Sequence, residues 1–336
     1  MSEDVVLESE ALRVTVRPHV GGTITSVLHK PTGLSVLGTV PWEPVDDPLE
    51  SGAAPDEPVW LTRYTGGWPL LFPNGGNACT VDGVFHGFHG EASISPWEVE
   101  ASSGSSMRLS RRFGSVPVRM RRDISVDDDL LMIREFAELE GSEPATVMWG
   151  HHPTFGSDLL AGEFEIQSGA RSVTTDEEYD PPSNPLRPGA TGAWPMIPGK
   201  GRTIDLRRPD MGSPDAGVAA LAYLYGFESP WIAIRRMDNA VAATLSWDSS
   251  VFPSLWYWIE LGGTSDAPWS GRARLIGLEP STTRLAHGLG EAKRHHAGTL
   301  TLRPGSTRSA VIRLHVCKPS GAVHGIDSHG HARFSK

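Results

Sequence analysis

The sequence predicts an all-β protein, built as one large domain of mostly antiparallel strands in a sandwich or a barrel. Three observations support this prediction. Several long segments alternate apolar and polar residues with the period of two that is typical of strands. The 37 glycines and 27 prolines of the 336-residue chain interrupt these segments every few residues, as turns between short strands require. Helical periodicity is scarce.

The alternating segments follow one another along most of the chain. Residues 12–37 alternate on both sides of the turn residues Gly21 and Gly22. Residues 107–140 repeat the alternation over three successive segments. Shorter segments of the same kind lie at residues 144–156, 230–249 and 299–316.

The remaining stretches suggest one domain with a short tail. Residues 40–58 and 180–200 are rich in Pro and Gly and are expected to be long loops over a sheet, since no internal repeat or linker divides the chain. We therefore expect residues 1–318 to form a single domain. Residues 319–336 are polar and are expected to form a mobile tail, in which a disordered end is favoured over a weak metal site. The tail holds His324, His329 and His331.

Composition and charge exclude several kinds of partner. The net charge is −10 and the longest basic stretch, Arg119 to Arg122, is short, so no nucleic-acid partner is expected. No run of 18 apolar residues exists, so no membrane partner is expected either. The acidic N-terminus lacks an apolar signal segment, which predicts a cytoplasmic location. Cys79 and Cys317 belong to no CxxC motif, and the sequence neither requires nor excludes a disulfide between them.

Four short clusters place polar or aromatic side chains beside Gly or Pro, where the backbone can hold a fixed geometry. They lie at residues 66–77, 86–89, 149–155 and 277–281. In a β fold, site residues come from distant segments, so these clusters are the candidate site. Their side chains are Trp68, Asn74, Asn77, His86, His89, Trp149, His151, His152 and Glu279.

Each cluster also has a simpler interpretation. A histidine in a strand is more often packed or exposed than catalytic. Glu279 follows an apolar run and precedes a proline, which suits a strand-end carboxylate facing a cavity, although an ion pair with an arginine would explain it too. The pair His86 and His89 would point to opposite faces of a strand, so their spacing favours a shared metal only on a turn.

The sequences of these clusters, and their order along the chain, resemble those of the aldose 1-epimerase (galactose mutarotase-like) family. The resemblance spans residues 10 to 317, nearly all of the chain. The segments that carry it are VRPHVGGTITSVLHKPTGLSVL, GGWPLLFPNGGNACTVDGVFHGFHGEASISPWEV, WGHHPTFG, LIGLEPSTT and LTLRPGSTRSAVIRLHV.

This resemblance implies a β-supersandwich of mostly antiparallel strands with a sugar site. It implies that Glu279 removes the proton from the anomeric hydroxyl while His152, which precedes a proline, protonates the ring oxygen. The sugar ring then opens, the aldehyde rotates, and closure gives the other anomer. His86 is expected to face the sugar as a hydrogen-bond partner, and His89 is a further substrate-binding residue with a less defined role. A histidine and a shielded carboxylate suit such acid–base chemistry near pH 7.

Other residues complete the expected site. Trp68, Trp97 and Trp149, with Trp256 and Trp258, offer aromatic faces on which a pyranose can stack, although most of the 11 tryptophans must belong to the core. Asn77 is expected to bind the sugar.

Two features leave the base and the sugar open. Glu260, in an aromatic-rich segment, is a second candidate base. The loop around Asn74 lacks the arginine that galactose-type members carry there, and Arg63 is the nearest substitute upstream. The sugar need not be galactose or glucose.

The expected reaction needs no cofactor and no metal, and its partner is a small-molecule sugar; the chain is expected to be a monomer or a homodimer. Two alternatives remain open. One is a non-catalytic sugar-binding or sensor protein on the same fold. The other is a metal-dependent sugar isomerase or lyase, for which the available ligands are His86, His89, His151, His152 and Glu279.

Overall fold

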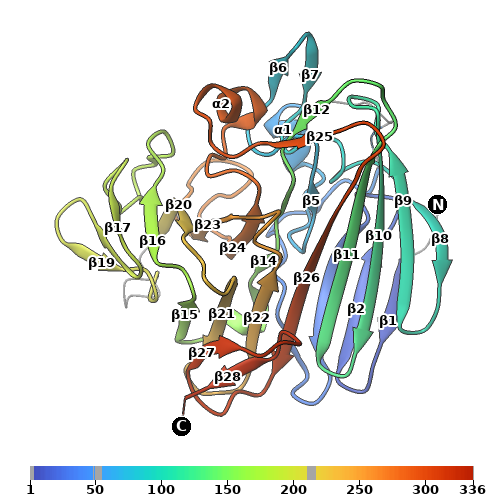
Figure 1. Ribbon diagram of the computed structural model, residues 1–336. Coiled ribbons are helices and arrows are strands. Elements are labelled where there is room, and N and C mark those ends of the chain that lie inside the picture. Colours follow the sequence, from blue (N-terminus) through green and yellow to red (C-terminus); the bar gives the residue numbers. More distant parts are fainter. Residues whose placement is uncertain (1–3, 48, 50–54, 210–216, 336) are drawn as a thin grey trace.

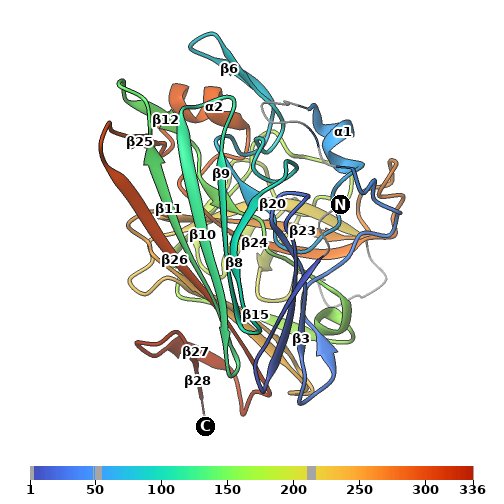
Figure 2. The ribbon, with the colours of Figure 1, turned by 90° about the vertical axis from the view of Figure 1, so that its right-hand side faces the viewer.

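A computed structural model describes residues 4–47, 49, 55–209 and 217–335. It confirms the all-β prediction, since two large antiparallel sheets dominate the molecule (Figures 1 and 2). We name them the β26 sheet and the β24 sheet after their central strands. One hydrophobic cluster runs from Leu7 to Val316 and includes residues of both sheets, so a single core lies between them.

The β26 sheet has eight strands, and its long strands lie along one side of the molecule in Figure 1. In spatial order they are β15 (Phe164–Ser168), β21 (Trp231–Arg236), β22 (Ala242–Trp247), β26 (Thr307–Cys317), β11 (Leu130–Leu139), β10 (Val118–Asp127), β9 (Ser106–Arg112) and β8 (Glu98–Ser102).

The β24 sheet has eight strands as well, of which β14 pairs only with β24. In spatial order they are β17 (Thr191–Ala193), β16 (Ser172–Thr175), β20 (Val218–Tyr225), β23 (Ser254–Leu261), β24 (Arg274–Ser281), β13 (Gly150–His151) and β5 (Leu70–Leu71), with β14 (Thr154–Phe155) beside β24.

Smaller elements complete the fold. The N-terminal sheet contains β1 (Val5–Glu8), β2 (Leu12–Arg17), β3 (Thr23–His29) and β4 (Leu34–Ser35). Four two-stranded pairs are β6 (Cys79–Val81) with β7 (Val84–His86), β12 (Ala145–Val147) with β25 (Leu300–Leu302), β18 (Met196–Pro198) with β19 (Thr203–Asp205), and β27 (Val323–Ile326) with β28 (Ala332–Phe334). The helices are α1 (Glu57–Leu61), α2 (Gly288–Arg294) and the short 3-10 helix η1 (Ser157–Leu160).

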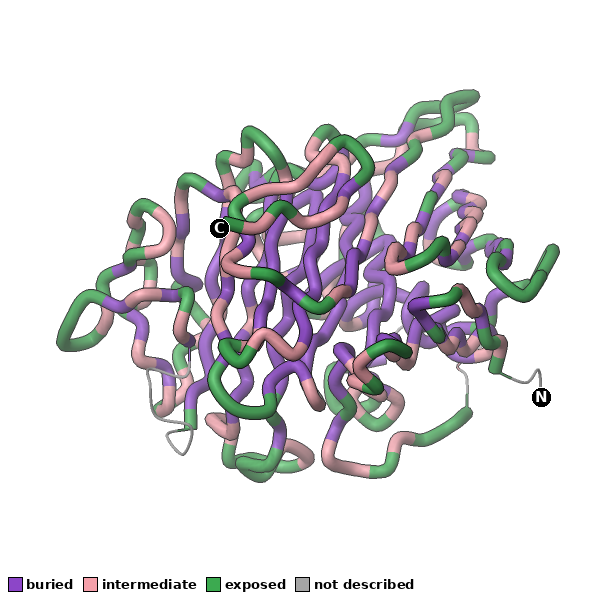
Figure 3. The backbone as a smooth tube through the Cα atoms, turned by 90° about the horizontal axis from the view of Figure 1, so that it is seen from below, coloured by how far each residue is buried: buried purple, intermediate pink, exposed green. Residues whose placement is uncertain are grey.

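The period of two in the sequence becomes the alternation between core and surface. In β10, every second residue from Val118 to Val126 is buried, and the residues between them are more exposed. Figure 3 shows the result for the whole molecule: buried strands fill the centre and exposed loops surround them. One of the buried residues of β10 is Arg122, which requires a charged partner on a neighbouring strand.

The structure differs from the expectation in both stretches that were predicted to be long loops. Residues 180–200 contain β17 and β18, which add short strands rather than a plain loop. The stretch 40–58 leads into α1, whose first turn Asp56 caps by accepting from the backbone N–H of Val59. Part of this stretch, residues 48 and 50–54, lies outside the described residues.

The segment from residue 319, predicted as a mobile tail, forms the β27–β28 hairpin. Val323 and Phe334 pack on Trp231, and the backbone N–H of Val323 donates to the side chain of Gln167. Apolar residues among the polar ones account for this packing. No helix among the residues described is both long and apolar enough to cross a bilayer. Cys79 and Cys317 are not bonded to each other.

Candidate active site

A cavity of about 290 Å³ lies over one face of the β24 sheet, at the end of the molecule where α1, α2 and the β6–β7 hairpin gather (Figures 1 and 2). Its wall is strongly aromatic. The aromatic lining residues are Trp60, Tyr64, Phe88, Tyr179, Trp256, Trp258 and Trp269. Polar side chains converge on the same space, as is typical of a ligand site; they are Glu57, Asn77, His89, His152, Thr264, Glu279 and His287.

Cross-strand pairing builds the floor of this cavity. Tyr223 on β20 pairs with Trp256 on β23, and Trp256 pairs with Glu279 on β24, so the three side chains form one row across the sheet. The neighbours Tyr257 and Leu278 belong to the core on the opposite face. Alternation along the strands therefore separates the polar site from the apolar interior.

A glycine makes room for the carboxylate of Glu279. Gly277 pairs with Trp258 in the next row of the same face. A Cβ atom at Gly277 would lie 2.2 Å from Oε1 of Glu279 and 3.2 Å from Cβ of Trp258. Because real Cβ atoms do not approach oxygen so closely, only glycine at position 277 allows Glu279 its place in the floor.

His152 faces Glu279 from the adjacent β13–β14 segment. Its Nε2 lies 3.7 Å from Oε1 of Glu279. Its Nδ1 lies 3.0 Å from the hydroxyl of Thr154, which in turn contacts the hydroxyl of Tyr64 at 2.6 Å. These two hydroxyls fix the imidazole ring and leave Nε2 to the cavity.

Burial shifts the pKa values of both groups toward their uncharged forms. Glu279 is 2% exposed, and burial raises its pKa well above the usual value of 4.5. Burial also lowers the pKa of His152 to about 4, although a backbone hydrogen bond opposes this effect. In the empty cavity, burial thus favours the form of the pair in which Glu279 carries a proton and His152 is neutral.

His89 is the third polar group beside this pair. The backbone N–H of Gly76 donates to its Nδ1 at 2.9 Å, and the N–H of His89 donates to the carbonyl of Gly76. Since Nδ1 accepts, the ring proton lies on Nε2. The pKa of His89 is held well below its usual value by burial first and by His152 second, so His89 is a neutral donor. Its ring centroid lies 5.3 Å from that of His152.

Gly76 joins two walls of the cavity. A Cβ atom there would lie 1.6 Å from the carbonyl oxygen of Ala286, and the residue has φ +78°, so only glycine fits. An isolated bridge pairs Gly76 with His287 in the loop before α2. Asn74 stabilises the same loop, because its side chain donates to the carbonyls of Asn77 and Gly87. Asn74 is therefore a structural residue, whereas Asn77 lines the cavity.

His151 lies on the other side of its strand, in the core. Its Nδ1 accepts from the indole N–H of Trp68, and its Nε2 lies 2.9 Å from Glu135. Glu135 forms an ion pair with Arg122 and accepts from the indole of Trp149. Adjacent residues of a strand point to opposite faces, which is why only His152 of the pair reaches the cavity.

The structure places several other predicted residues outside the cavity. Trp68, Trp97 and Trp149 are at most 4% exposed and belong to the core, so none of them offers a face to a ligand. Their indole N–H groups donate to protein acceptors instead. Trp256 and Trp258 do line the cavity.

Two predicted polar residues also lie elsewhere. His86 pairs with Cys79 in the β6–β7 hairpin and is absent from the lining, and its Nδ1 is buried without a partner among the described residues. Glu260 lies on the same face as Trp258, but the turn that follows β23 covers it. The backbone N–H groups of Gly263 and Thr264 and the Thr264 hydroxyl donate to its carboxylate. Since His86 and His151 lie apart from His152 and Glu279, the five-ligand metal site is not assembled. No three His, Cys, Asp or Glu side chains in the described ranges are placed to hold a metal ion.

Sequence reasoning missed three elements of the site. Trp60 comes from α1, whose start was marked by Asp56 followed by Pro58, a usual signal for a helix N-terminus. Trp269 comes from the β23–β24 connection. His287 and its partner Asp176 come from loops, and nothing in their sequence context distinguishes them from other exposed polar residues.

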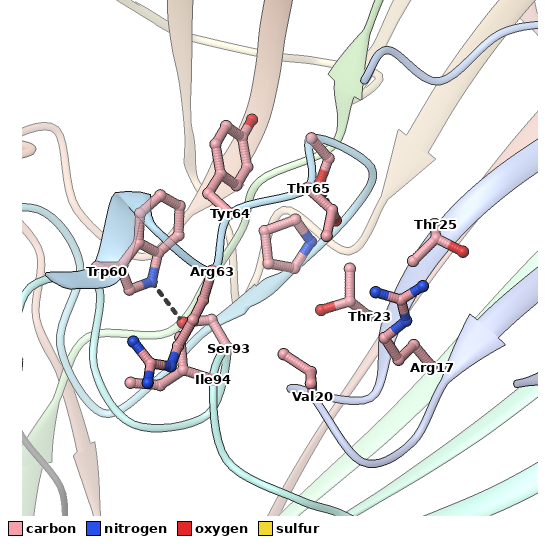
Figure 4. A pocket seen from close by; sticks show the side chains of 12 residues that line it. Arg17, Val20, Thr23, Thr25, Trp60, Arg63, Tyr64, Thr65, Ser93 and Ile94 are labelled. Atoms are coloured by element: carbon pink, nitrogen blue, oxygen red, sulfur yellow. Dashed lines mark hydrogen bonds between the residues drawn. The ribbon is translucent and has the colours of Figure 1, made fainter. Parts of the chain in front are cut away.

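A much smaller pocket shares a wall with the cavity (Figure 4). Trp60 and Tyr64 line both, and the indole N–H of Trp60 donates to Ser93 on the small pocket's side. Arg17 and Arg63 lie around this pocket, but its volume of about 10 Å³ holds no more than one water molecule. The candidate site is therefore the larger of these two, the cavity over the β24 sheet.

Comparison with known proteins identifies the fold. No protein-family model and no curated protein matches the chain. Solved structures match nearly all of it. A candidate aldose 1-epimerase from Escherichia coli K12 is 16% identical, with a TM-score of 0.66 over 94% of this chain and 99% of that one.

Two further structures agree. A galactose mutarotase related enzyme from Lactobacillus acidophilus is 17% identical, with a TM-score of 0.62 over 94% of this chain and 97% of the other. An aldose epimerase homologue from C. elegans is 14% identical, with a TM-score of 0.62 and coverage of 95% and 99%. The chain thus has the galactose mutarotase-like fold, as the sequence resemblance predicted.

Proposed function

We propose that this chain, a protein with the galactose mutarotase-like fold, is an aldose 1-epimerase. It would interconvert the α and β anomers of an aldose by opening and closing the sugar ring. The observation that supports this most is the pair formed by Glu279 and His152, 3.7 Å apart in the floor of an aromatic cavity.

The spacing of this pair suits the reaction. Ring opening removes a proton from the anomeric hydroxyl and delivers one to the ring oxygen, and both oxygens are bonded to the same carbon. Two neighbouring groups on one side of the sugar can therefore serve both. In the proposed opening step, ionised Glu279 accepts the hydroxyl proton while protonated His152 donates to the ring oxygen.

A single shared proton is sufficient for the cycle. After opening, Glu279 is protonated and His152 is neutral, which is also the form that burial favours in the empty cavity. Rotation about the bond between C1 and C2 exposes the other face of the aldehyde, and closure returns both protons. The reaction needs the charged form of the pair, ionised Glu279 with protonated His152, only while a sugar is bound. The hydroxyl groups of the sugar can then form hydrogen bonds to the two charged groups.

The rest of the cavity supports sugar binding. Trp256 and Trp258 lie beside Glu279 in the floor and offer faces on which the C–H side of a pyranose can stack. His89 offers a neutral N–H donor from the wall. Because every group in this account belongs to the protein, the proposed reaction requires no cofactor.

The proposal is tested by anomer exchange on a panel of neutral aldoses, dissolved as pure anomers and followed by polarimetry or NMR. We expect at least one aldose to equilibrate faster with the protein than without it, in proportion to protein concentration. Tight sugar binding with no acceleration for any aldose would instead favour the non-catalytic binding protein.

A further inference from the structure

A second polar cluster lies at the opposite end of the cavity floor from Glu279. Asp176, which follows β16, accepts a hydrogen bond from the hydroxyl of Tyr223 and lies 2.7 Å from Nε2 of His287. The backbone N–H groups of Glu178 and Tyr179 donate to the other oxygen of Asp176. This buried carboxylate is therefore fully occupied by protein donors.

These contacts fix His287 toward the cavity. Its Nε2–H is directed to Asp176, while its Nδ1 has only the exposed carboxylate of Glu178 nearby, at 3.9 Å, beyond hydrogen-bond range. His287 lines the cavity, and its loop is anchored to Gly75 and Gly76. Burial lowers the pKa of His287, but the hydrogen bond and charge of Asp176 outweigh burial and raise it overall, which favours a second ring proton on Nδ1.

The register of the sheet gives the distance between the two polar ends. Tyr223, Trp256 and Glu279 are successive cross-strand partners, and neighbouring strands lie about 4.8 Å apart. Tyr223 is thus about 10 Å from Glu279 along the floor, with the Trp256 ring between them. One pyranose ring, with hydrogen bonds of about 2.8 Å at each end, fits this span.

The charges around the cavity indicate what His287 binds. Asp176 offsets any positive charge on His287, and among the described lining residues there is no arginine or lysine, whereas Glu57 and Glu279 are acidic. The residues outside the description contain no arginine and only one lysine, Lys336. A phosphate or carboxylate group on the sugar would meet no compensating positive charge.

We propose that His287, which lines the cavity and is held in place by Asp176 and Tyr223, forms the subsite for the end of the sugar remote from the anomeric carbon, with its Nδ1 hydrogen-bonded to a hydroxyl of an unphosphorylated pyranose. This inference rests on the proposed function, because Glu279 and His152 define where the anomeric carbon lies. His287 is then a specificity-determining residue, and Asp176 is a positioning residue that acts through it.

Binding measurements test this subsite independently of turnover. We would measure the affinity of the best aldose of the panel, and of its analogues deoxygenated at each position away from C1 and C2, by quenching of tryptophan fluorescence. For the wild-type protein, at least one such analogue should bind about tenfold or more weakly than the parent sugar.

The variant His287→Gln should then lose about tenfold in affinity for the parent sugar while binding that one analogue as the wild type does. KM should rise more than kcat falls. Asp176→Asn should act in the same direction, and His295→Gln, on the exposed side of α2, should have no effect.

Three outcomes would overturn the inference. The first is equal loss of affinity for the parent sugar and every analogue in His287→Gln, which marks a purely structural role. The second is tighter binding of a sugar phosphate than of the parent sugar. The third is a wild-type protein that binds every deoxygenated analogue as well as the parent sugar, which refutes the subsite even if the variants do not fold. Failure of the proposed function gives a different result from failure of the subsite. In that case the protein does not accelerate anomer exchange, but the affinities for the parent sugar and its analogues still follow the pattern described above.

Discussion

At the scale of single residues, burial decides where the protons of the site reside. Glu279 and His152 are both almost fully buried, and burial shifts the pKa of each group toward its uncharged form in the empty cavity. His151, one residue away, lies among Glu135 and the indole of Trp68 instead. Residue type alone therefore does not decide which of the two histidines reaches the cavity; the side of the strand does.

The shared proton predicts a bell-shaped pH dependence of kcat/KM. At low pH the pair gains a second proton, with a limb near the pKa of about 4 of His152. At high pH Glu279 loses the remaining proton of the pair. This limb lies above pH 4.5, because burial raises the pKa of Glu279 above its usual value. The rate of anomer exchange, corrected for the spontaneous reaction at each pH, measures this profile. A rate that rises without limit on the alkaline side would contradict a one-proton pair.

His86 and His89, three residues apart in the sequence, lie in different places in the structure. The sequence predicted that His86 faces the sugar, whereas the structure places His89 in the cavity and His86 in the β6–β7 hairpin. We therefore expect His89→Ala to lower kcat/KM about tenfold or more, as loss of a hydrogen bond to substrate predicts, and His86→Ala to have the smaller effect. Both variants need a thermal unfolding measurement alongside, and the reverse order of effects would restore the original assignment.

At the scale of elements, the alternation of β23 and β24 creates the site. Alternate positions along both strands face the core and the cavity. The sequence pattern did not predict these two strands by alternation, because both of their faces are buried and few polar positions mark a surface. Only the apolar run before Glu279 suggested the end of a strand. The pattern did not predict that β24 pairs with β13 and β14, because strands more than 120 residues apart come together only through the sheet order. The resemblance to known sequences, rather than periodicity, predicted that Glu279 and His152 belong to the same site.

The close approach at Gly277 gives an element-scale prediction. Gly277→Ala should displace the carboxylate of Glu279, since the new Cβ would lie 2.2 Å from Oε1. We expect at least a tenfold loss of kcat, because a displaced carboxylate is no longer positioned to accept the proton of the anomeric hydroxyl. Gly104→Ala is the matched control, since nothing lies within 4 Å of a Cβ there. Equal activity of the two variants would show that Glu279 is not held by this contact.

At the scale of the whole molecule, the core contains a buried charge network behind the site. Arg122 and Glu135 lie on neighbouring strands of the β26 sheet, and Arg122 also donates to the carbonyl of Gly22. Through His151 and Trp149, Glu135 contacts the segment that carries His152. Sequence patterning predicted the strands of this sheet and the single core but not this network, because nothing in the alternating segment distinguishes Arg122 from Arg119 and Arg121 or indicates its partner.

Removing one member of the network should destabilise the protein as a whole. Burial alone would raise the pKa of Glu135, but His151 and Arg122 with their hydrogen bonds lower it to about 2. We expect Glu135→Gln to lower the free energy of unfolding at pH 7 by about 3–5 kcal/mol, because Arg122 is left unpaired. Urea denaturation measures this, with the exposed Glu138→Gln on the same strand as control.

The sign of its pH dependence follows from the lowered pKa. Below 4.5 the unfolded chain binds a proton at position 135 that the folded protein resists, so the stabilisation by Glu135 is complete above 4.5 and disappears as the pH falls toward 2. The difference between wild type and Glu135→Gln should shrink over that range. A difference that does not change with pH would show that the ion pair is not its origin.

The most direct test of the central claim compares Glu279→Gln and Glu260→Gln in anomer exchange on the best aldose of the panel. The amide keeps the shape of residue 279 but accepts no proton, so Glu279→Gln should lose the acceleration while still folding and binding the sugar. His152→Asn should lose about 10²-fold or more. Glu260→Gln should keep most of the activity, because Glu260 is occupied by its own turn. A wild-type rate in Glu279→Gln, with the activity lost in Glu260→Gln, would contradict the account.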